Sequence, residues 1–322
     1  MWIRDDFKKL KLTLPSGVTI GAFDGVHLGH QAVISGMVTD AHSQGLLPLV
    51  ITFDPLPGQV LQPDSYRLLS TLEERLTLFE SLGVEGLVVL PFNSALTQTS
   101  AGDFVQDLLN HAKLRGLWVG PDFKLGRGQE GDVDYLRSAG RRFSFDVHVF
   151  EGTVRWEGKR VSSSSIRRAL SEGNIHEANG CLGYRFHLCG KIVHGYRRGR
   201  TLGFPTANLA VPSTRLLPAN GVYICQAHLK SGTFDALTNV GTRPTFDNGT
   251  RTVEAYLLDF SEDIHGEPMR LDFLNRLRPE WRFDSVDDLI HQMTEDEVTA
   301  RLWLRQPDQS IRTRHPVCPK AR

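Results

Sequence analysis

Two histidines near the N-terminus lie in a glycine-rich stretch, GAFDGVHLGH, whose composition suits phosphate binding. His27 and His30 are three residues apart, so they share a face on the first turn of a helix. Gly21, Gly25 and Gly29 leave room for a ligand to approach the backbone. Backbone N–H groups and the positive end of a helix dipole favour an anion at such a turn. The stretch predicts a phosphate-binding turn; the alternative is an ordinary strand-to-helix turn with two surface histidines.

A second candidate phosphate site is the run RVSSSSIR, which combines hydroxyl and guanidinium groups. Serines that precede a helix are good N-caps, so the run predicts a helix start. Ser163 and Ser164 with Arg160 and Arg167 also provide donors of the kind that bind phosphate oxygens. The alternative interpretation is a capped surface helix without a ligand.

A third candidate site lies in the second half of the chain, in the stretch GRTLGFPTAN. Thr206 and Asn208 offer a hydroxyl and an amide oxygen, which are hard ligands suited to Mg²⁺, and Gly203 allows the preceding segment to fold over phosphates. Pro205 fixes its own φ and stiffens the approach to Thr206. Further on, Glu254 stands in a β-prone run, where a carboxylate is able to accept a proton but where most glutamates are simply exposed.

The elements around the first two candidate sites alternate between β-prone and amphipathic runs, which predicts a parallel sheet with helical crossovers. Strands are expected at 18–23, 46–53, 86–91 and 116–120, and helices at 30–44, 71–82, 101–111, 132–139 and 175–182. Thr71 and Glu74 predict a capping box at the start of one helix. Ligands of such sheets bind at the carboxyl ends of the strands, so the loops after the first, second and fourth strands are expected to line one crevice.

The elements of the second half form a different pattern, with short β-prone runs separated by turn residues. The runs cover 186–193, 222–229, 233–240, 252–259 and 268–274. This pattern predicts a small antiparallel β-barrel, and the periodic run 285–303 predicts a helix packed across it. We expect domains at 1–183 and 184–305, followed by a flexible tail at 306–322.

The composition excludes several classes of partner. Lys+Arg and Asp+Glu both number 37 in the 322 residues, so nothing favours nucleic acid or an anionic membrane. The four cysteines are scattered without a Cys-x-x-Cys pair, so neither a disulfide framework nor a zinc site is expected. The start of the chain lacks the apolar segment of a signal peptide, and no uncharged run reaches the roughly 18 residues that span a bilayer. We expect a cytoplasmic protein; the oligomeric state is left open.

The motifs, taken in order, resemble those of the bacterial bifunctional riboflavin kinase and FAD synthetase family. They are GAFDGVHLGH, FDPLP, VGPDFKLGRG and RVSSSSIR, then GRTLGFPTANL, NVGTRPTF, and TVEAYLLDF followed by IHGEPM. Each motif alone has limited specificity, but their joint order and spacing are highly specific, and they cover about residues 18–304. The resemblance implies an α/β fold. A Rossmann-like parallel-sheet nucleotidyltransferase domain would precede a riboflavin kinase-like antiparallel β-barrel with a terminal helix.

For the first half, the resemblance implies transfer of AMP from ATP to FMN, which yields FAD and pyrophosphate. The residues that it assigns to ATP are Gly21, Phe23, Asp24, Gly25, His27, Gly29, His30, Arg160, Ser163, Ser164 and Arg167. Among these, His27, His30 and Arg167 would be catalytic. Asp122, in the PDF of the third motif, matches a position near the flavin phosphate.

For the second half, the resemblance implies phosphorylation of riboflavin to FMN by ATP, with Mg²⁺ as cofactor. Thr206 and Asn208 would hold Mg²⁺ and, with Gly203, ATP. Glu254 would be the catalytic base that accepts the proton of the riboflavin 5′-hydroxyl. Arg243, in TRPTF, would help to position the flavin and its phosphate.

Three positions depart from the family pattern: Leu56 replaces a common histidine, Leu125 a common phenylalanine and His265 a common tyrosine. Leu56 removes a polar group near the expected triphosphate, which leaves open a riboflavin kinase with a weakened or inactive adenylyltransferase domain. A non-catalytic flavin-binding regulator is a third hypothesis, against which the intact Thr206, Asn208 and Glu254 argue. Adenylyltransferases of the cytidylyl or pantetheine-phosphate type share the histidine motif but not the Pro-Thr-Ala-Asn module.

Overall fold

The structure of the protein is a computed structural model that describes residues 1–194, 203–242 and 251–306. The chain forms two compact units, residues 1–161 and 162–322. Two helices, α7 (Ser163–Glu172) and α8 (Ile175–Leu182), belong to the second unit. The side chain of Asn179 in α8 donates to the Phe273 carbonyl (2.9 Å) and accepts from the Phe186 N–H (2.6 Å). These two hydrogen bonds tie α8 to the barrel.

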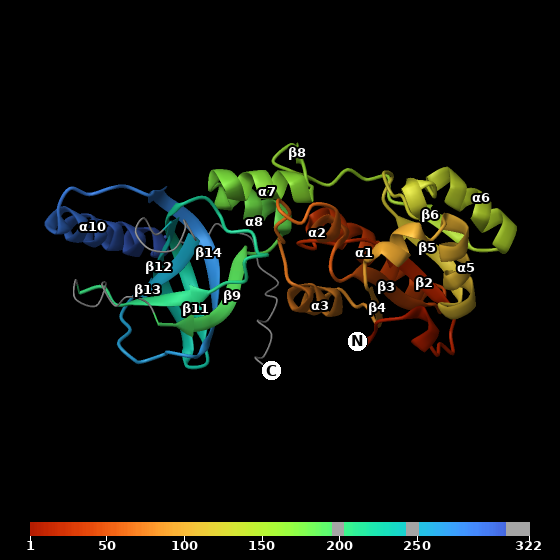
Figure 1. The fold of residues 1–322 in the computed structure, drawn as a ribbon, viewed down its shortest axis with the longest axis horizontal. Helices are drawn as coiled ribbons and strands as arrows, with labels where there is room; N and C mark the ends of the chain where they lie inside the picture. The colour runs from red at the N-terminus through yellow and green to blue at the C-terminus, as the bar shows by residue number, and fades with distance from the viewer. Residues whose placement is uncertain (195–202, 243–250, 307–322) are drawn as a thin grey trace. The chain divides into compact units, whose positions relative to one another are not determined.

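The first unit is built on a six-stranded sheet with the order β1-β4-β3-β2-β5-β6, in which every pair is parallel. Figure 1 labels β2 to β6 of this sheet. The strands are β1 (Trp2–Arg4), β2 (Ser16–Ile20), β3 (Leu47–Phe53), β4 (Gly86–Leu90), β5 (Leu114–Val119) and β6 (Asp146–Val149). The predicted parallel sheet is therefore confirmed. The strand order changes direction at β2, whose neighbours are β3 and β5, and this is the point where such sheets bind ligands.

The main helices of the first unit follow the predicted pattern. They are α1 (Leu28–Ser43), α3 (Leu72–Ser81), α5 (Ala101–His111) and α6 (Val133–Phe143), with the shorter α2 (Pro57–Leu61) and α4 (Ser94–Gln98). The Thr71–Glu74 capping box is confirmed, because each side chain accepts from the other's backbone N–H (3.3 and 2.8 Å). The expected end of α6 at residue 139 was wrong: the helix continues to Phe143 and ends at Ser144, which has a left-handed φ of 60°. A short hairpin, β7 (Arg155–Trp156) and β8 (Lys159–Arg160), ends the unit.

The second unit contains a closed antiparallel barrel of six strands, in the order β10-β13-β12-β11-β14-β9. The strands are β9 (His187–Val193), β10 (Thr206–Ala210), β11 (Gly221–Leu229), β12 (Gly232–Thr242), β13 (Arg251–Leu257) and β14 (Pro268–Pro279). The predicted barrel is confirmed, but β10 was not predicted as a strand. It directly follows Pro205 in the GRTLGFPTAN motif, which lies outside the expected strands, and pairing with β9 and β13 makes it extended.

Helix α10 (Val286–Leu304) packs on the outer surface of the barrel, as predicted. Its Ala300 joins a buried cluster with Ile224 of β11 and Leu237 of β12. Among the residues that the structure describes, no helix is long and apolar enough to cross a membrane. The predicted tail lies almost entirely outside the described residues.

A buried ion-pair network joins the neighbouring strands β11 and β14. The Asp272 carboxylate is fully buried, and it accepts from Arg270 Nε (2.6 Å) and lies 3.1 Å from His228 Nε2. Burial acts to raise the pKa of Asp272, but the hydrogen bond from His228 and the charge of Arg270 outweigh it and lower the pKa to about 2. Asp272 is therefore ionised at neutral pH, and its contact with His228 joins β14 to β11.

Candidate active sites

The loop between β2 and α1 is a strained turn at the carboxyl edge of the parallel sheet. Phe23, Gly25 and Val26 have φ values of 48°, 78° and 34°, a region that non-glycine residues rarely adopt. A Cβ on Gly21 would lie 2.9 Å from the Phe23 ring, so a larger residue does not fit there without movement. Left-handed backbone at a non-glycine residue costs about 1–3 kcal/mol and persists only where the surroundings impose it.

The Asp24 carboxylate is one of the groups that hold this turn. It is buried and accepts from the backbone N–H groups of Leu69 and Ser70 (3.0 and 3.1 Å) and from the Tyr66 hydroxyl (3.1 Å). The Ser70 hydroxyl in turn accepts from the Gly25 N–H at 2.7 Å. Asp24, which the sequence assigned to ATP binding, thus connects the turn to the segment that leads into α3.

Arg75 of α3 also holds this turn, through hydrogen bonds from its guanidinium. Its side chain is 1% exposed and donates to the carbonyls of Ala22 and Phe53 (both 3.1 Å) and to Thr52 Oγ1 (2.8 Å). One guanidinium therefore joins the loop that follows β2 to the last residues of β3. Burial lowers the pKa of Arg75, but the carboxylates of Asp24 and others act in the opposite direction, and an arginine stays charged at any working pH.

His27 and His30 lie together on the first turn of α1, as predicted. His27 is the N-cap, its Nδ1 accepts from the His30 N–H (3.3 Å), and the two rings stack with centroids 3.6 Å apart. The Phe23 ring packs edge-on against His30 at 5.2 Å. Burial, and after it the proximity of His27, lower the pKa of His30 well below its usual value, so that His30 is neutral at pH 7. Its Nδ1 is buried and has no hydrogen-bond partner among the described residues.

Asp122 and Arg160, predicted to bind flavin and ATP, form an exposed ion pair with a 2.8 Å contact. Asp122 also lines a hollow of about 640 Å³ in the loop after β5, together with Lys124. Arg160 is in β8, close in sequence to the serine run. The two residues are thus brought together at the loops that extend from the sheet's carboxyl edge.

The serine run forms the start of α7, in the second unit. Ser162 is the N-cap and its side chain accepts from the Ser165 N–H at 3.1 Å, which confirms the predicted helix start. Ser163 and Ser164 occupy the first turn, where N–H groups point outward, and Arg167 follows one turn later. This first turn is a suitable anion site by its dipole and hydroxyls.

Two of the three departures from the family pattern are buried side chains. Leu56 is 0% exposed and precedes α2, and its backbone N–H donates to the Gln59 side chain (2.9 Å). Leu125 belongs to the core of the first unit, and its backbone pairs with Gly131. Both leucines therefore contribute apolar packing beneath the loops, and Leu56 offers no polar group there.

The candidate kinase residues meet across three strands of the barrel. Asn208 of β10 lies opposite Glu254 of β13, and Glu254 in turn lies opposite Asn239 of β12. Paired residues of antiparallel strands have Cβ atoms about 4.5–5.5 Å apart, so a carboxylate lies between two amides in one row. Thr206 precedes Asn208 by two residues and shares its face of β10. Sequence reasoning missed Asn239, since only the register of the barrel shows it beside Glu254.

Two cavities lie on either side of the start of β10, and Asn239 and Glu254 of this row line one of them. The Glu254 cavity, about 400 Å³, is lined by Phe204, Thr206, Asn239, Glu254, Tyr256, Trp281 and residues of α10. The His265 cavity, about 560 Å³, is lined by Gly203, Pro205, Thr206, Ala207, His194 and His265 among others. Residues 203–207 alternate between the two cavities, as expected of extended backbone, and Thr206 borders both.

His265, the third departure, is stacked on His194 with ring centroids 3.4 Å apart. Both imidazoles line the His265 cavity, so the position that is commonly tyrosine keeps an aromatic ring here. Arg243 lies outside the described residues, and its predicted role stays a prediction.

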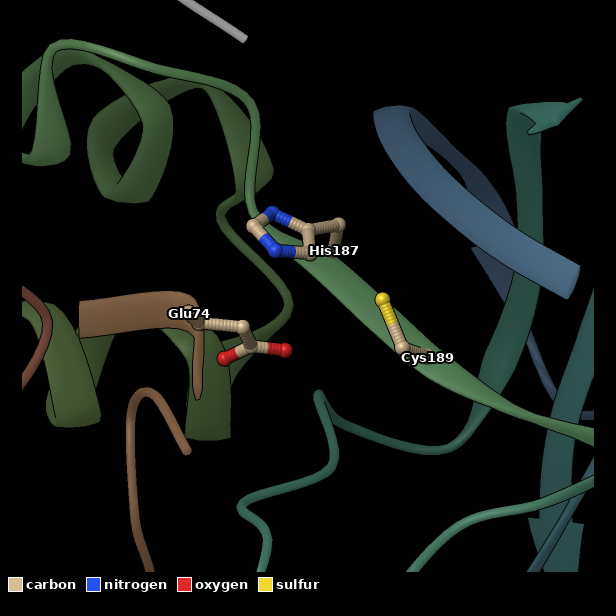
Figure 2. Close-up of side chains that lie close together, drawn as sticks. All are labelled: Glu74, His187 and Cys189. Atoms are coloured by element: carbon tan, nitrogen blue, oxygen red, sulfur yellow. The ribbon is translucent and has the colours of Figure 1, made fainter. Parts of the chain in front are cut away.

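The cysteines of the described chain form no disulfide, in line with the sequence. Cys181 and Cys225 are buried, and burial raises the pKa of the Cys225 thiol, which is therefore protonated. Cys189 lies two residues after His187 on the same face of β9 (Figure 2). Glu74, also drawn in Figure 2, is in the first unit, where its carboxylate is used in the capping box described above.

Comparison with known families gives the class of the protein. The sequence model of the FAD synthetase family matches residues 11–165, and that of the riboflavin kinase family matches residues 182–304. The chain is therefore a two-domain, ATP-using enzyme of flavin-cofactor synthesis, with kinase and nucleotidyltransferase activities.

Full-length relatives agree with this class. The bifunctional riboflavin kinase/FMN adenylyltransferase of Escherichia coli K12 is 36% identical over 288 residues, which cover 88% of this chain and 91% of the relative. The enzyme of the same description from Bacillus subtilis is 32% identical, with the same coverage. A solved structure described as a macrolide-efflux protein from Streptococcus pneumoniae matches with a TM-score of 0.85 and 31% identity, over 94% of this chain and 99% of that one. The chain belongs to the bifunctional riboflavin kinase/FMN adenylyltransferase family.

Proposed function

We propose that the two cavities at β10 are the substrate sites of the kinase reaction, with riboflavin in the Glu254 cavity and ATP in the His265 cavity. The main support is the position of Thr206, which lines both cavities, because phosphoryl transfer requires the acceptor hydroxyl and the γ-phosphate to meet. The aromatic wall of the Glu254 cavity suits a flavin ring. The 5′-hydroxyl oxygen attacks the γ-phosphorus, the bond to the β-phosphate oxygen breaks, ADP leaves, and Glu254 accepts the hydroxyl proton.

Mg²⁺ is the proposed cofactor of this step. Thr206 and Asn208 provide a hydroxyl and an amide oxygen on one face of β10, which are hard donors that fit this ion. When bound, Mg²⁺ would neutralise charge on the β- and γ-phosphate oxygens. Gly203 and Arg243 are further proposed contacts for phosphate and flavin, on sequence grounds.

Residues 1–183 are proposed to carry the adenylylation of FMN. An oxygen of the FMN phosphate attacks the α-phosphorus of ATP, the bond to the β-phosphate oxygen breaks, and pyrophosphate leaves. His27 and His30 are proposed to contact the phosphates of ATP, as are Arg160, Ser163, Ser164 and Arg167, while Asp122 would lie near the flavin phosphate. The strained turn, the neutral His30 and its unpartnered Nδ1 support this assignment.

The domain limits, 1–183 and 184–305, and a cytoplasmic location without nucleic-acid or membrane partners also stand as proposals. ATP and reduced thiols are both abundant in the cytoplasm, in keeping with the chain's chemistry.

Product analysis tests these assignments. The protein is incubated with riboflavin, ATP and MgCl₂, and the flavins are separated by chromatography. FMN followed by FAD is expected. Glu254→Gln should stop FMN formation yet still convert added FMN to FAD, and His30→Ala should do the reverse, losing about 10²–10³ in the FAD-forming rate.

The same experiment separates the competing functions. FMN alone would indicate a kinase with an inactive adenylyltransferase, the hypothesis that Leu56 favours. Unchanged riboflavin would indicate a flavin-binding regulator. A wild-type rate in Glu254→Gln would refute the proposed base.

A further inference from the structure

The wall of the Glu254 cavity contains a buried ion pair that the proposed reaction does not use. Arg278, at the end of β14, donates through Nε to both carboxylate oxygens of Asp296 of α10 (3.0 Å each) and through a terminal nitrogen at 2.8 Å. The two side chains are 10% and 5% exposed. Gln292, one turn earlier on α10, also donates to Asp296 (3.1 Å). Both members of the pair line the cavity.

The same guanidinium lies over two aromatic rings of the cavity wall. Its carbon is 4.6 Å from the ring centroid of Trp281 and 5.8 Å from that of Phe283. Trp281 is 48% exposed, which is unusual for an indole, and it also lines the cavity. Arg278 therefore joins the barrel, the 281–283 segment and α10, the elements that enclose this space.

A planar, bidentate arginine is suited to this task because it fixes direction as well as distance. A buried pair of this kind contributes little net stability compared with apolar residues of equal volume, so its value lies in the geometry that it imposes. Here the Arg278–Asp296 pair sets the positions of the Trp281 ring and of the α10 side chains Leu289 and Met293, which all line the cavity.

We propose that the Arg278–Asp296 pair is the positioning element for the flavin ring: it holds Trp281 and α10 so that the Glu254 cavity accepts an isoalloxazine. This rests on the proposed assignment of riboflavin to that cavity. Disturbing the pair lowers affinity for riboflavin without affecting the ATP side, since no residue of the pair lines the His265 cavity.

The test measures KM for riboflavin, KM for ATP and kcat of the full-length enzyme. Arg278→Lys keeps the charge but loses the planar fork, and it should raise the riboflavin KM about tenfold or more, with the ATP KM and kcat changed by less than about threefold. Arg278→Met with Asp296→Leu replaces the pair by apolar volume; it should fold and yet keep the raised riboflavin KM. FAD formation from added FMN in the same samples reports that the other activity is intact.

A matched control disturbs a different ion pair on α10. Asp259→Asn weakens the exposed clamp with Arg301 (2.8 Å contacts), which also ties α10 to the end of β13, and it should leave every constant unchanged. An unchanged riboflavin KM in Arg278→Lys, or a normal one in the double variant, would overturn the proposal. Glu254→Gln is measured in parallel: if it keeps kinase activity, the assignment of the cavity itself has failed, whatever the Arg278 variants show.

Discussion

Arg75 offers the sharpest test of how the adenylyltransferase turn is maintained. Arg75→Met keeps the length of the side chain but removes the guanidinium, so the carbonyls of Ala22 and Phe53 and the hydroxyl of Thr52 lose their donor. A hydrogen bond to a charged group contributes about 1.5–3 kcal/mol. The variant also avoids the cost of burying a charge, which offsets part of the loss of the three hydrogen bonds. The free energy of unfolding should therefore fall by about 2–4 kcal/mol.

The functional loss should exceed the loss of stability. A displacement of about 1 Å at a site that works by alignment costs about 10²-fold in rate, and Arg75 fixes the loop after β2 against the end of β3. The assay compares FAD formation from FMN with FMN formation from riboflavin in one preparation, and follows thermal unfolding. The FAD-forming rate should fall about 10²-fold while the kinase rate stays unchanged. Arg137→Met, at an exposed arginine of the same unit, is the control. The reasoning is refuted if Arg75→Met forms FAD at the rate of that control.

Three further outcomes concern titration and hydrogen bonding. The pKa of His30 is depressed in the folded chain, so its contribution to stability is complete above the usual value of about 6.5 and is lost as the pH falls. The free energy of unfolding should therefore differ less between pH 5 and pH 8 in His30→Asn than in the wild type. The pKa of Asp272 is lowered from 3.8 to about 2, so its contribution is present above 3.8 and lost as the pH falls towards 2. Asp272→Asn should cost about 3–5 kcal/mol at pH 7 in denaturant titration, since Arg270 is left buried without its charge partner. Tyr223→Phe leaves the carbonyl of Ala219 without its donor and should lower the unfolding free energy by about 1–3 kcal/mol in the same assay, unlike a control at an exposed tyrosine.

Local patterns were sufficient to predict most elements of the two units. The parallel sheet, the barrel, α10 and the Thr71–Glu74 capping box follow from periodicity and capping residues, which act over a few positions. Strand β10 was missed because its extended form comes from pairing with β9 and β13, strands that are distant in sequence.

Some features of the candidate sites also followed from local sequence, whereas others depend on tertiary packing. His27 and His30 were expected to share a face, and they stack as neighbours on α1. Arg75 was overlooked although it carried a signal: it is a charged residue on the apolar side of a predicted amphipathic helix, which implies a buried partner. The burial of Leu56 had no such signal, since it depends on how the loop after β3 folds.

The closed barrel limits where the proposed substrates of the kinase reaction can bind. A six-stranded barrel is filled by its own side chains and has no free edge, so its interior leaves no room for the proposed substrates. The alternation of residues 203–207 puts a single strand between the two cavities, each with its own walls. If riboflavin and ATP occupy these cavities as proposed, each is surrounded by side chains that the other does not contact, and Thr206 is the one residue of the described chain that lines both cavities.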